Sequence, residues 1–506
     1  MAAADANEGW TRATAAVAAL AFASFAAALP NGPLGDDLLL LEQRLDAEGW
    51  LALARHFGES WWGTLHEGGL YRPVSLVLLG AQKLLFGEGL AGFHAVGLAV
   101  HAATSVLCLV ALRRLDLPTG PAFAGAALFA CHPIHAEAVA TLHGQPDLYA
   151  ACFAMAALVH PGLDGEDRRK RIVGGIGVGL LGLASLLSKE SALLLPLFSA
   201  GLRAVRDPGS GPAGWWGTRE WILTGAVLVA VSLRFAVLGS DALPQGEGSV
   251  AHGYPLWARV QLVVVTLGTY LKLLVLPWGQ TIYYGHLRDA IFGTPLIEAA
   301  WLAVGALALF VAWRSLDRRL VACSLGALAL GLAPVANVVP IGVAVAERCL
   351  YLPSLALAPL AAAVWARVAS ARVAWPKVGL ALLLIVSLVL CVRVSLRWQT
   401  PLAHWEATAA DHPRSPKAHA VVARLTVDWL EREGAAAGDP RWSTVEGAVE
   451  RALTLNPQLP DAFHARGRSW IARGDCSRAF PDLRRAQQLR PGDPRIAADL
   501  SRCAAR

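Results

Sequence analysis

The chain has 506 residues, of which 55% are apolar, and its mean hydropathy is +0.46. This composition excludes an ordinary soluble domain. The net charge of +6 does not indicate nucleic-acid binding, because most Lys and Arg residues lie in short loops between apolar runs, where they act as topology signals. In lipid only helices and closed barrels satisfy their backbone groups, and runs of Leu, Ala, Val and Gly without period-two alternation favour helices.

Long apolar runs predict about eleven membrane-spanning helices, since a crossing needs roughly 20 apolar residues. We expect the crossings near residues 13–30, 91–112, 121–140, 148–162, 172–187, 191–205, 220–239, 296–313, 319–335, 350–368 and 378–397. The first run also fits a cleaved signal peptide, but its length and weak basic start favour an uncleaved helix. Residues 73–87 are expected to form an interfacial helix.

The basic residues in the loops orient the helices. The loops that we take as cytoplasmic contain Arg113 and Arg114, residues 168–171, Arg203 and Arg206, residues 314–319, and residues 367–377. The loops placed outside are 31–73, 141–147, 240–258 and 336–347. A crossing at the apolar residues 260–276 would reverse the later basic loops, so we expect a re-entrant or outer-face segment there. The chain then ends outside.

The polar residues 399–506 carry a repeat of 34 residues, whereas residues 1–398 form the predicted membrane domain. Consensus positions of a tetratricopeptide repeat are filled by Phe463, Gly467, Trp470, Ala479, Leu483, Ala486 and Pro491. The Gly and Ala positions let the two helices of a repeat approach closely. An earlier copy starts near Pro413 and is lengthened by the loop 432–441. Such repeats either bind peptides or partner proteins or only cap the membrane domain.

Two of the eight cysteines lie in this tail, Cys476 and Cys503. In an oxidising compartment they could form a disulfide, and the sequence leaves open whether they pair. The other six lie in or beside predicted spans and are expected to be small core residues.

Polar and ionisable residues gather on the predicted outer face, where they are functional candidates. They are Asp36, Asp37, Arg72, His132, His135, Glu137, Asp147, Lys189, Arg234, Glu347 and Arg348, with "YYGHLRD" at 283–289. This set suits an acceptor that is deprotonated beside a bound phosphate. An Asp can act as general base, while Arg and Lys bind the phosphate and stabilise it as a leaving group.

Each of these groups also has a structural interpretation. The paired acids fit a solvated surface, Arg72 fits an interface anchor, and Glu347 with Arg348 fits an ion pair between helices. His132, His135 and Glu137 could hold a divalent cation, although satisfied interfacial side chains are the commoner outcome.

Several segments resemble the transmembrane-and-tetratricopeptide-repeat (TMTC) proteins of the C-type glycosyltransferase superfamily. They are "YRPVSLVLL" (71–79), "FHAVGLAVHAATSVL" (93–107), "ALFACHPIHAEAVATLHGQPDLYAACF" (127–153), "SLLSKESALLLPL" (185–197), "VAERCLYLPSLAL" (345–357) and the junction 395–419. The resemblance is collinear over nearly the whole chain. It implies transfer of a sugar, mannose in the best-known members, from a polyprenyl phosphate to a protein hydroxyl.

The resemblance also implies roles for residues of this chain. Asp36 would be the catalytic base, with Asp37 second, and the expected donor-phosphate contacts are Arg72, Arg348, Lys189 and Arg234. His132, His135, Glu137 and Asp147 match the family signature without individual roles. The chain departs from the family at "GQPD" (144–147), where an Arg is more usual, and in its short repeat array.

High Ala, Gly and Arg usage suggests a bacterial inner-membrane protein with periplasmic repeats and an undecaprenyl-phosphate donor. The expected partners are the lipid-linked sugar and an acceptor protein at the repeats. A different class of function is a non-catalytic scaffold that recruits envelope proteins through its repeats. A third possibility joins glycans to lipid or polysaccharide rather than to protein.

Overall fold

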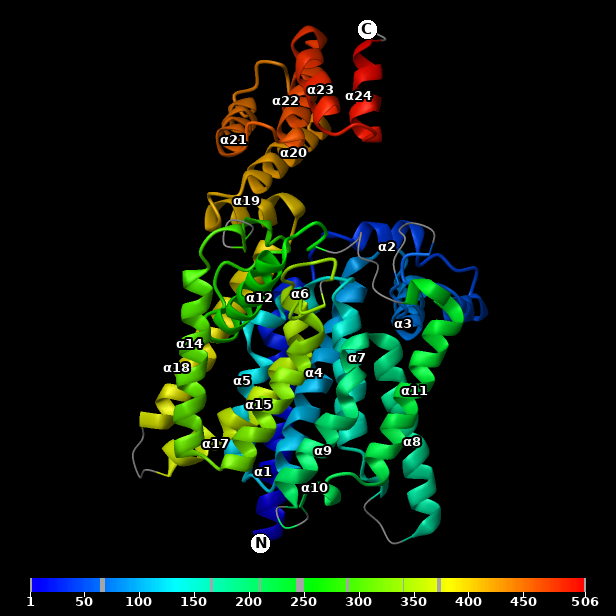
Figure 1. Ribbon diagram of the computed structural model, residues 1–506, viewed down its shortest axis with the longest axis vertical. Coiled ribbons are helices and arrows are strands. Elements are labelled where there is room, and N and C mark those ends of the chain that lie inside the picture. The colour runs from blue at the N-terminus through cyan, green and yellow to red at the C-terminus, as the bar shows by residue number, and fades with distance from the viewer. Residues whose placement is uncertain are drawn as a thin grey trace. The chain divides into compact units, whose positions relative to one another are not determined.

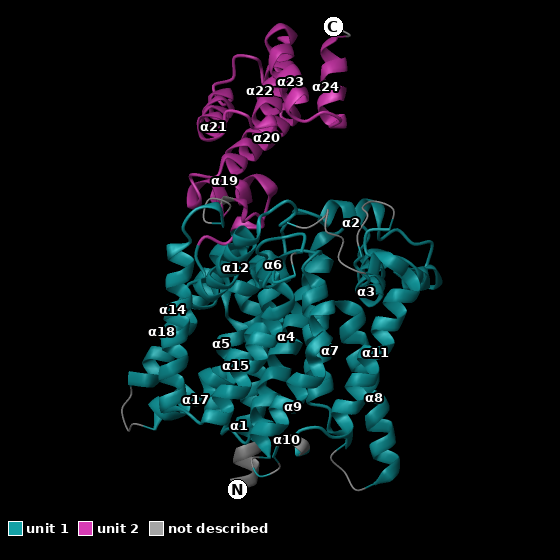
Figure 2. Ribbon diagram, viewed as in Figure 1, with its two compact units in different colours: residues 1–278, 289–396 teal, residues 279–288, 397–506 magenta. Residues whose placement is uncertain are grey.

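The computed structural model describes residues 2–63, 69–163, 167–207, 209, 211–242, 250–287, 291–339, 341–370 and 375–504. Every regular element within these ranges is a helix, which confirms the predicted all-α class (Figure 1). The chain divides into two compact units (Figure 2). Unit 1 contains residues 1–278 and 289–396, and unit 2 contains residues 279–288 and 397–506.

Nine helical stretches of the described residues are long and apolar enough to cross a membrane, which confirms a polytopic bundle. They contain α1 (Ala2–Phe25), α4 (Leu90–Arg114), α8 (Arg168–Ser188), α11 (Thr218–Leu238), α12 (Leu256–Val275), α14 (Leu296–Ser315), α15 (Arg318–Leu332), α17 (Ala358–Ala369) and α18 (Trp375–Arg397). Large apolar side chains stay exposed on this unit, among them Leu296 at 71% and Trp375 at 80%. Such surfaces suit contact with lipid.

Eight of the eleven expected crossings are among these nine stretches, and the ninth is α12, which was not expected to cross. The other three expected crossings are built from shorter helices. They are α5 (Thr119–Ala130), α7 (Gln145–Leu158) and α9 (Leu195–Arg206). The run expected at 121–140 breaks after Ala130, because Pro133 disfavours helical geometry in the residue before it. The 3-10 turn η3 (Pro133–His135) and the short helix α6 (Ala136–Ala140) follow.

Helix α12 meets the length and composition of a span, yet its middle contacts an inter-helix loop. The Thr266 hydroxyl donates to the carbonyl of Ala344 at 3.1 Å, and the Ala346 amide donates to the Tyr270 hydroxyl at 3.3 Å. The loop that follows α15 therefore lies along the middle of α12. Residues 260–276 were expected to be re-entrant or at the outer face, but by length and composition α12 is one of the nine candidate spans.

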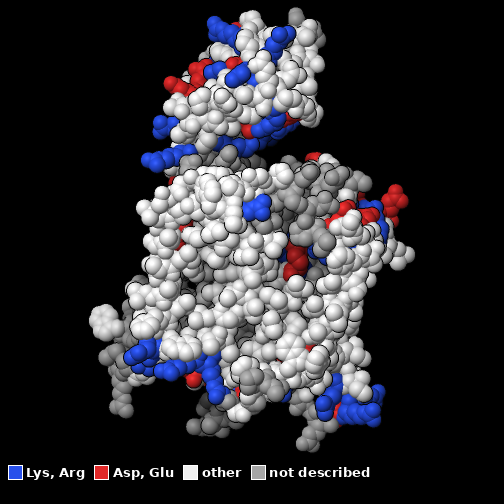
Figure 3. All heavy atoms as spheres, viewed as in Figure 1, with Lys and Arg blue, Asp and Glu red and all other residues white. Residues whose placement is uncertain are grey.

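Basic side chains gather at one end of unit 1, away from α2 (Asp37–Gln43) and α3 (Pro73–Phe86) (Figures 1 and 3). At this end α4 finishes with Arg113 and Arg114, and α9 finishes with Arg203 and Arg206. Helix α15 begins there with Arg318. Three of the five loops expected to be cytoplasmic thus share one end of the unit.

Unit 2 contains the predicted repeats as helix pairs. They are α19 (Pro401–Asp411), α20 (Pro416–Arg432), α21 (Trp442–Leu455), α22 (Pro460–Ala472), α23 (Cys476–Leu489) and α24 (Pro494–Ala504). Helices α22 and α24 begin at Pro460 and Pro494, 34 residues apart. A Cβ at Gly467 would lie 2.7 Å from Leu483, so the glycine lets α22 and α23 approach closely.

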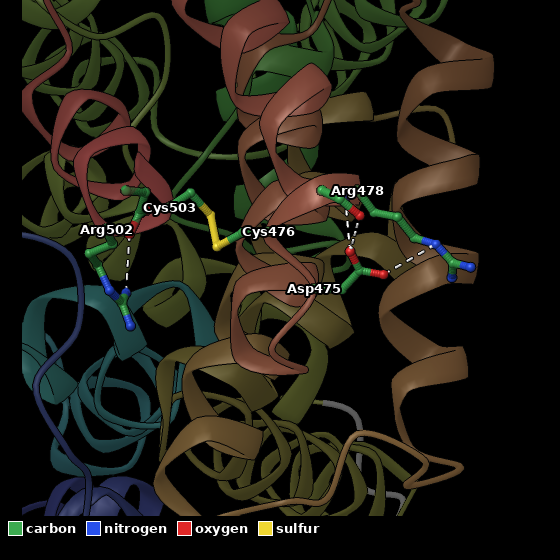
Figure 4. The surroundings of a disulfide bond; sticks show 7 residues. Asp475, Cys476, Arg478, Arg502 and Cys503 are labelled. Carbon is green, nitrogen blue, oxygen red and sulfur yellow. Dashed lines mark hydrogen bonds and ion pairs between the residues drawn. A yellow bond between two sulfur atoms is a disulfide. The ribbon is translucent and has the colours of Figure 1, made fainter. Parts of the chain in front are cut away.

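A disulfide joins Cys476 at the start of α23 to Cys503 in α24, which answers the question that the sequence left open (Figure 4). The Asp475 carboxylate caps α23 by accepting a hydrogen bond from the Arg478 amide at 3.0 Å. Because the bridge closes the last helix onto the repeat, it restrains the end of the array.

The segment 279–287 belongs to unit 2, although it follows α12 in the chain. The Thr281 and Thr408 hydroxyls lie 3.0 Å apart, and the His412 ring donates to the carbonyl of Gly279 at 2.9 Å. Within the motif 283–289, the Tyr283 ring lies 5.8 Å from the Trp405 ring of α19, measured between centroids. The last two residues of the motif lie outside the described residues.

Candidate active site

The two adjacent acids at the start of α2 have different environments. Gly35 has a φ of +60°, and the chain turns there before α2 begins. Asp36 is exposed, and within the described residues no hydrogen bond or ion pair involves its carboxylate. Asp37 is fully buried. Its Oδ1 accepts hydrogen bonds from the amides of Leu142 and His143, both at 3.0 Å, and its Oδ2 accepts from the Leu34 amide at 3.1 Å.

His143 joins Asp37 to a second buried acid. Its Nδ1 donates to Oδ1 of Asp37 at 2.8 Å, and its Nε2 lies 3.8 Å from Oε1 of Glu137. Burial opposes a charged ring, but Asp37 and Glu137 raise the pKa of His143 to about 9. The imidazolium is therefore the form that bridges the two carboxylates at neutral pH.

Glu137 in turn holds Arg348. Its Oε2 accepts from the Arg348 amide at 2.8 Å, and its Oε1 accepts from the guanidinium Nη1. Burial would raise the pKa of Glu137, but Arg348 and His143 together lower it to about 2. Glu137 is almost fully buried, whereas the Arg348 side chain is 21% exposed. The chain of contacts from Asp37 thus ends at a cation that reaches the surface.

Two further ion pairs lie close by. Lys189 Nζ donates to Oδ2 of the buried Asp147 at 2.5 Å. The Arg72 Nε donates to Oε2 of Glu190 at 2.9 Å, and its Nη2 bonds the other oxygen. Helix α3 is fixed to the end of α8 by a 2.9 Å hydrogen bond from Ser75 to the Ser188 carbonyl, which brings Arg72 to Glu190.

Four of the predicted cations therefore come together, although Asp36 makes no described contact with them. Arg72 lies close enough to Arg348 for the two charges to interact, and Arg234 lies similarly close to both Arg72 and Glu190. The Arg234 Nε donates to the carbonyl of Ala242 at 3.1 Å. The Arg72 guanidinium also lies 5.5 Å from the centre of a Trp61 ring.

The signature histidines point in different directions. His132 Nε2 donates to the carbonyl of Leu274 at 3.0 Å, and His135 Nε2 lies 3.0 Å from the Ser354 hydroxyl. Glu137 faces His143 and Arg348 instead, so the three do not converge on one cation. Within the described ranges no cluster of three His, Cys, Asp or Glu side chains could hold a metal. Glu347 is fully buried beside Arg348.

A groove of about 420 Å³ starts at these histidines. Its polar end is lined by His132, His135 and Ser354, and its walls come from apolar residues of α5, α17 and α18, among them Leu128 and Val386. The turn η3 packs against η10 (Glu347–Leu350), which carries Arg348. The polar end of the groove therefore lies on a turn that contacts the turn carrying Arg348.

Sequence reasoning missed His143, Glu190 and Trp61 as members of the site. His143 and Glu190 lie within segments quoted for the family resemblance, so the local pattern flagged their neighbourhood. No local sequence pattern indicated that these side chains belong to the site, because the hydrogen bond between His143 and Asp37 joins residues that are 106 positions apart.

The chain is similar to curated animal proteins. It is 29% identical over 310 residues to "Protein O-mannosyl-transferase Tmtc2" of Drosophila melanogaster, covering 56% of this chain and 33% of that protein. It is 26% identical to "Protein O-mannosyl-transferase Tmtc3" of the same fly over 405 residues, 64% of this chain and 43% of the relative. It is 24% identical to human "Protein O-mannosyl-transferase TMTC4" over 408 residues, which cover 67% of this chain and 53% of that protein.

The aligned part spans about a third to a half of the length of these relatives. Their names support the resemblance to TMTC proteins, whereas their animal origin gives no support to a bacterial source. No family model and no solved structure matches the chain.

Proposed function

We propose that this chain is a membrane glycosyltransferase that moves a mannose-like sugar from a polyprenyl phosphate to a protein hydroxyl. The observation that carries the proposal is the cluster of Arg72, Lys189 and Arg348, held by buried or half-buried carboxylates. Of these three, Arg348 lies at the end of the contact network that starts at Asp37, the neighbour of the exposed Asp36. The names of the relatives support the reaction class.

In this reaction Asp36 accepts the proton of the acceptor hydroxyl, whose oxygen attacks C1 of the sugar. The bond between C1 and the phosphate oxygen breaks, and the polyprenyl phosphate leaves with the electron pair. Arg348 bonds Glu137 through Nη1, and Arg72 bonds Glu190 through Nε and Nη2. A guanidinium has five N–H donors, so both arginines retain donors for the phosphate.

Asp37 suits a positioning role rather than that of the base. Three donors occupy its Oδ1, and the residue is fully buried. It fixes the loop before α7, and through His143 it fixes Glu137 and Arg348. The lipid tail of the donor would lie in the 420 Å³ groove, whose apolar walls match a prenyl chain.

We place unit 2 on the outer face, where it would bind the acceptor protein. The Cys476–Cys503 disulfide supports this side, because disulfides persist in oxidising compartments. A groove of about 490 Å³ in unit 2 is lined by Glu446, Arg466 and Trp470, among others. Mixed charges beside an aromatic ring suit a peptide segment.

The test is transfer of radiolabelled mannose from a synthetic polyprenyl phosphate to membrane proteins by the purified full-length chain. Asp36→Asn should abolish transfer and leave the thermal unfolding midpoint unchanged, since Asp36 is exposed. Glu42→Gln, an exposed acid on the same helix, is the matched control and should retain activity. Asp37→Asn should lower both activity and the midpoint.

Two results would contradict the proposal. If Asp36→Asn retains transfer, the assignment of the base is wrong. If the wild-type chain transfers nothing while changes on the repeat surface abolish capture of a partner, the scaffold function is correct instead. Label recovered on lipid or glycan rather than on protein would identify a different acceptor.

A further inference from the structure

A second cavity, of about 190 Å³, lies in unit 1 between α4, α7, α9, α15 and the turns before α17. Leu112, Met155, Phe198, Leu202 and Leu330 contribute to its apolar walls. It shares no lining residue with the groove at His132. The donor site proposed above therefore does not account for it.

The cavity is elongated and reaches the molecular surface. Along α15 its lining runs from Leu320 to Leu330, a helical rise of about 15 Å. Leu197 in its wall is 41% exposed, and Phe198 and Leu202 are half-buried. Apolar cavities of about 150 Å³ stay dry and bind hydrocarbon. An apolar chain that enters from the surface is the ligand that fits these walls.

Charge gathers at one end of this cavity, where the lining includes Leu115, Val205 and Leu320. The helix ends that supply these residues carry Arg113, Arg114, Arg203, Arg206, Arg318 and Arg319. The acids in the same stretches are Asp116, Asp207 and Asp317. These stretches carry six arginines and three aspartates. Arg203 also lies 3.9 Å from the buried Glu220, and Asp317 already accepts a hydrogen bond from the Leu320 amide at 2.9 Å. The excess charge lies in the basic end of unit 1 (Figure 3).

We propose that this cavity binds an acyl chain of an anionic phospholipid, whose phosphate head group contacts the arginines at its basic end. The ligand needs both an acyl chain and an anionic head group. A free phosphate would leave the apolar walls of the cavity empty, and a zwitterionic lipid would not neutralise the excess positive charge. Basic pockets between transmembrane helices bind anionic head groups. The positive-inside rule explains basic loops here, but it does not explain an apolar cavity that ends among them.

The head-group half is tested with the purified full-length chain in detergent, titrated with phosphatidylglycerol or phosphatidylcholine. Native mass spectrometry counts the bound lipid, and the thermal unfolding midpoint reports stabilisation. Phosphatidylglycerol should bind and raise the midpoint. Arg206→Ala and Arg318→Ala should each weaken its binding about five-fold. Arg168→Ala with Arg171→Ala, in the equally basic start of α8 that does not line the cavity, should bind as wild type.

The acyl-chain half is tested by filling the cavity. A Cβ at Gly326 would meet no atom within 4 Å, so Gly326→Leu enters the space without a clash at Cβ and improves helix propensity. It should reduce phosphatidylglycerol binding more than ten-fold. Gly225→Leu on α11 is the control, since a Cβ there is equally unobstructed and the residue does not line the cavity.

The proposal is overturned if Gly326→Leu binds phosphatidylglycerol as tightly as the wild type. It is also overturned if phosphatidylcholine binds equally well, or if the control variants lose binding to the same extent. None of these outcomes depends on glycosyl transfer.

Discussion

His143 should make the stability of unit 1 depend on pH between 6.5 and 9. Burial disfavours its charged ring, but Asp37 and Glu137 raise its pKa from 6.5 to about 9. A pKa that is raised by folding gives stabilisation that is fully present below pH 6.5 and is lost as the pH rises through 9. At about 1.4 kcal/mol per pKa unit, this interval corresponds to about 3 kcal/mol. His143→Gln should remove this dependence and lower stability at pH 6.

The assay is denaturant unfolding of the full-length chain in detergent, followed by Trp fluorescence at several pH values. His160→Gln is the control, because its ring accepts a hydrogen bond from the Gly162 amide at 3.1 Å rather than facing a carboxylate. This variant should keep the wild-type slope. The reasoning is refuted if wild type and His143→Gln lose the same stability between pH 6.5 and 9.

Three further changes can be measured by unfolding of the full-length chain. Lys189→Met leaves Asp147 buried and unpaired and should lower the free energy of unfolding by about 3–5 kcal/mol. The double variant that also carries Asp147→Leu should recover most of this loss. Equal losses in the single and the double variant would contradict the prediction. Cys476→Ser removes a disulfide between residues 27 positions apart and should lower the free energy of unfolding of unit 2 by about 3.5 kcal/mol. Reduction of the wild type should have the same effect. Gly467→Ala places a Cβ 2.7 Å from the Leu483 side chain and should lower the free energy of unfolding by about 1–3 kcal/mol. Gly447→Ala, whose Cβ would meet no atom within 4 Å, should not destabilise the chain.

Much of the fold follows from local patterns. The interval from Pro460 to Pro494 equals the 34-residue period, and the interval from Pro416 to Pro460 is ten residues longer, the length of the loop 432–441. Crossings with uninterrupted apolar runs were also predictable. The break after Ala130 was not predicted, because the mean hydropathy of a long window stays high across Pro133 and hides the effect of this single residue.

Tertiary partners account for what local patterns did not predict. The motif 283–289 was expected among the polar groups of the outer face. The residues just before it, Thr281 and Gly279, contact Thr408 of α19 and the following His412, more than 120 positions later. Likewise, six cysteines were expected in or beside spans, and the sulfur of Cys391 donates to the carbonyl of Cys131 at 3.1 Å. Such contacts depend on the packing of distant helices, which no window of sequence contains.

The two adjacent acids show where prediction of the site stops. The sequence placed Asp36 and Asp37 together after the first crossing, but consecutive residues at a helix start point in different directions. Burial separates them: Asp37 accepts four hydrogen bonds inside the protein, and Asp36 remains at the surface. One acid can therefore hold His143 and, through it, Glu137 and Arg348, while the other keeps an exposed carboxylate, as the proposed base requires. A site with one reactive acid and one positioning acid is consistent with the pair, and only the fold tells them apart.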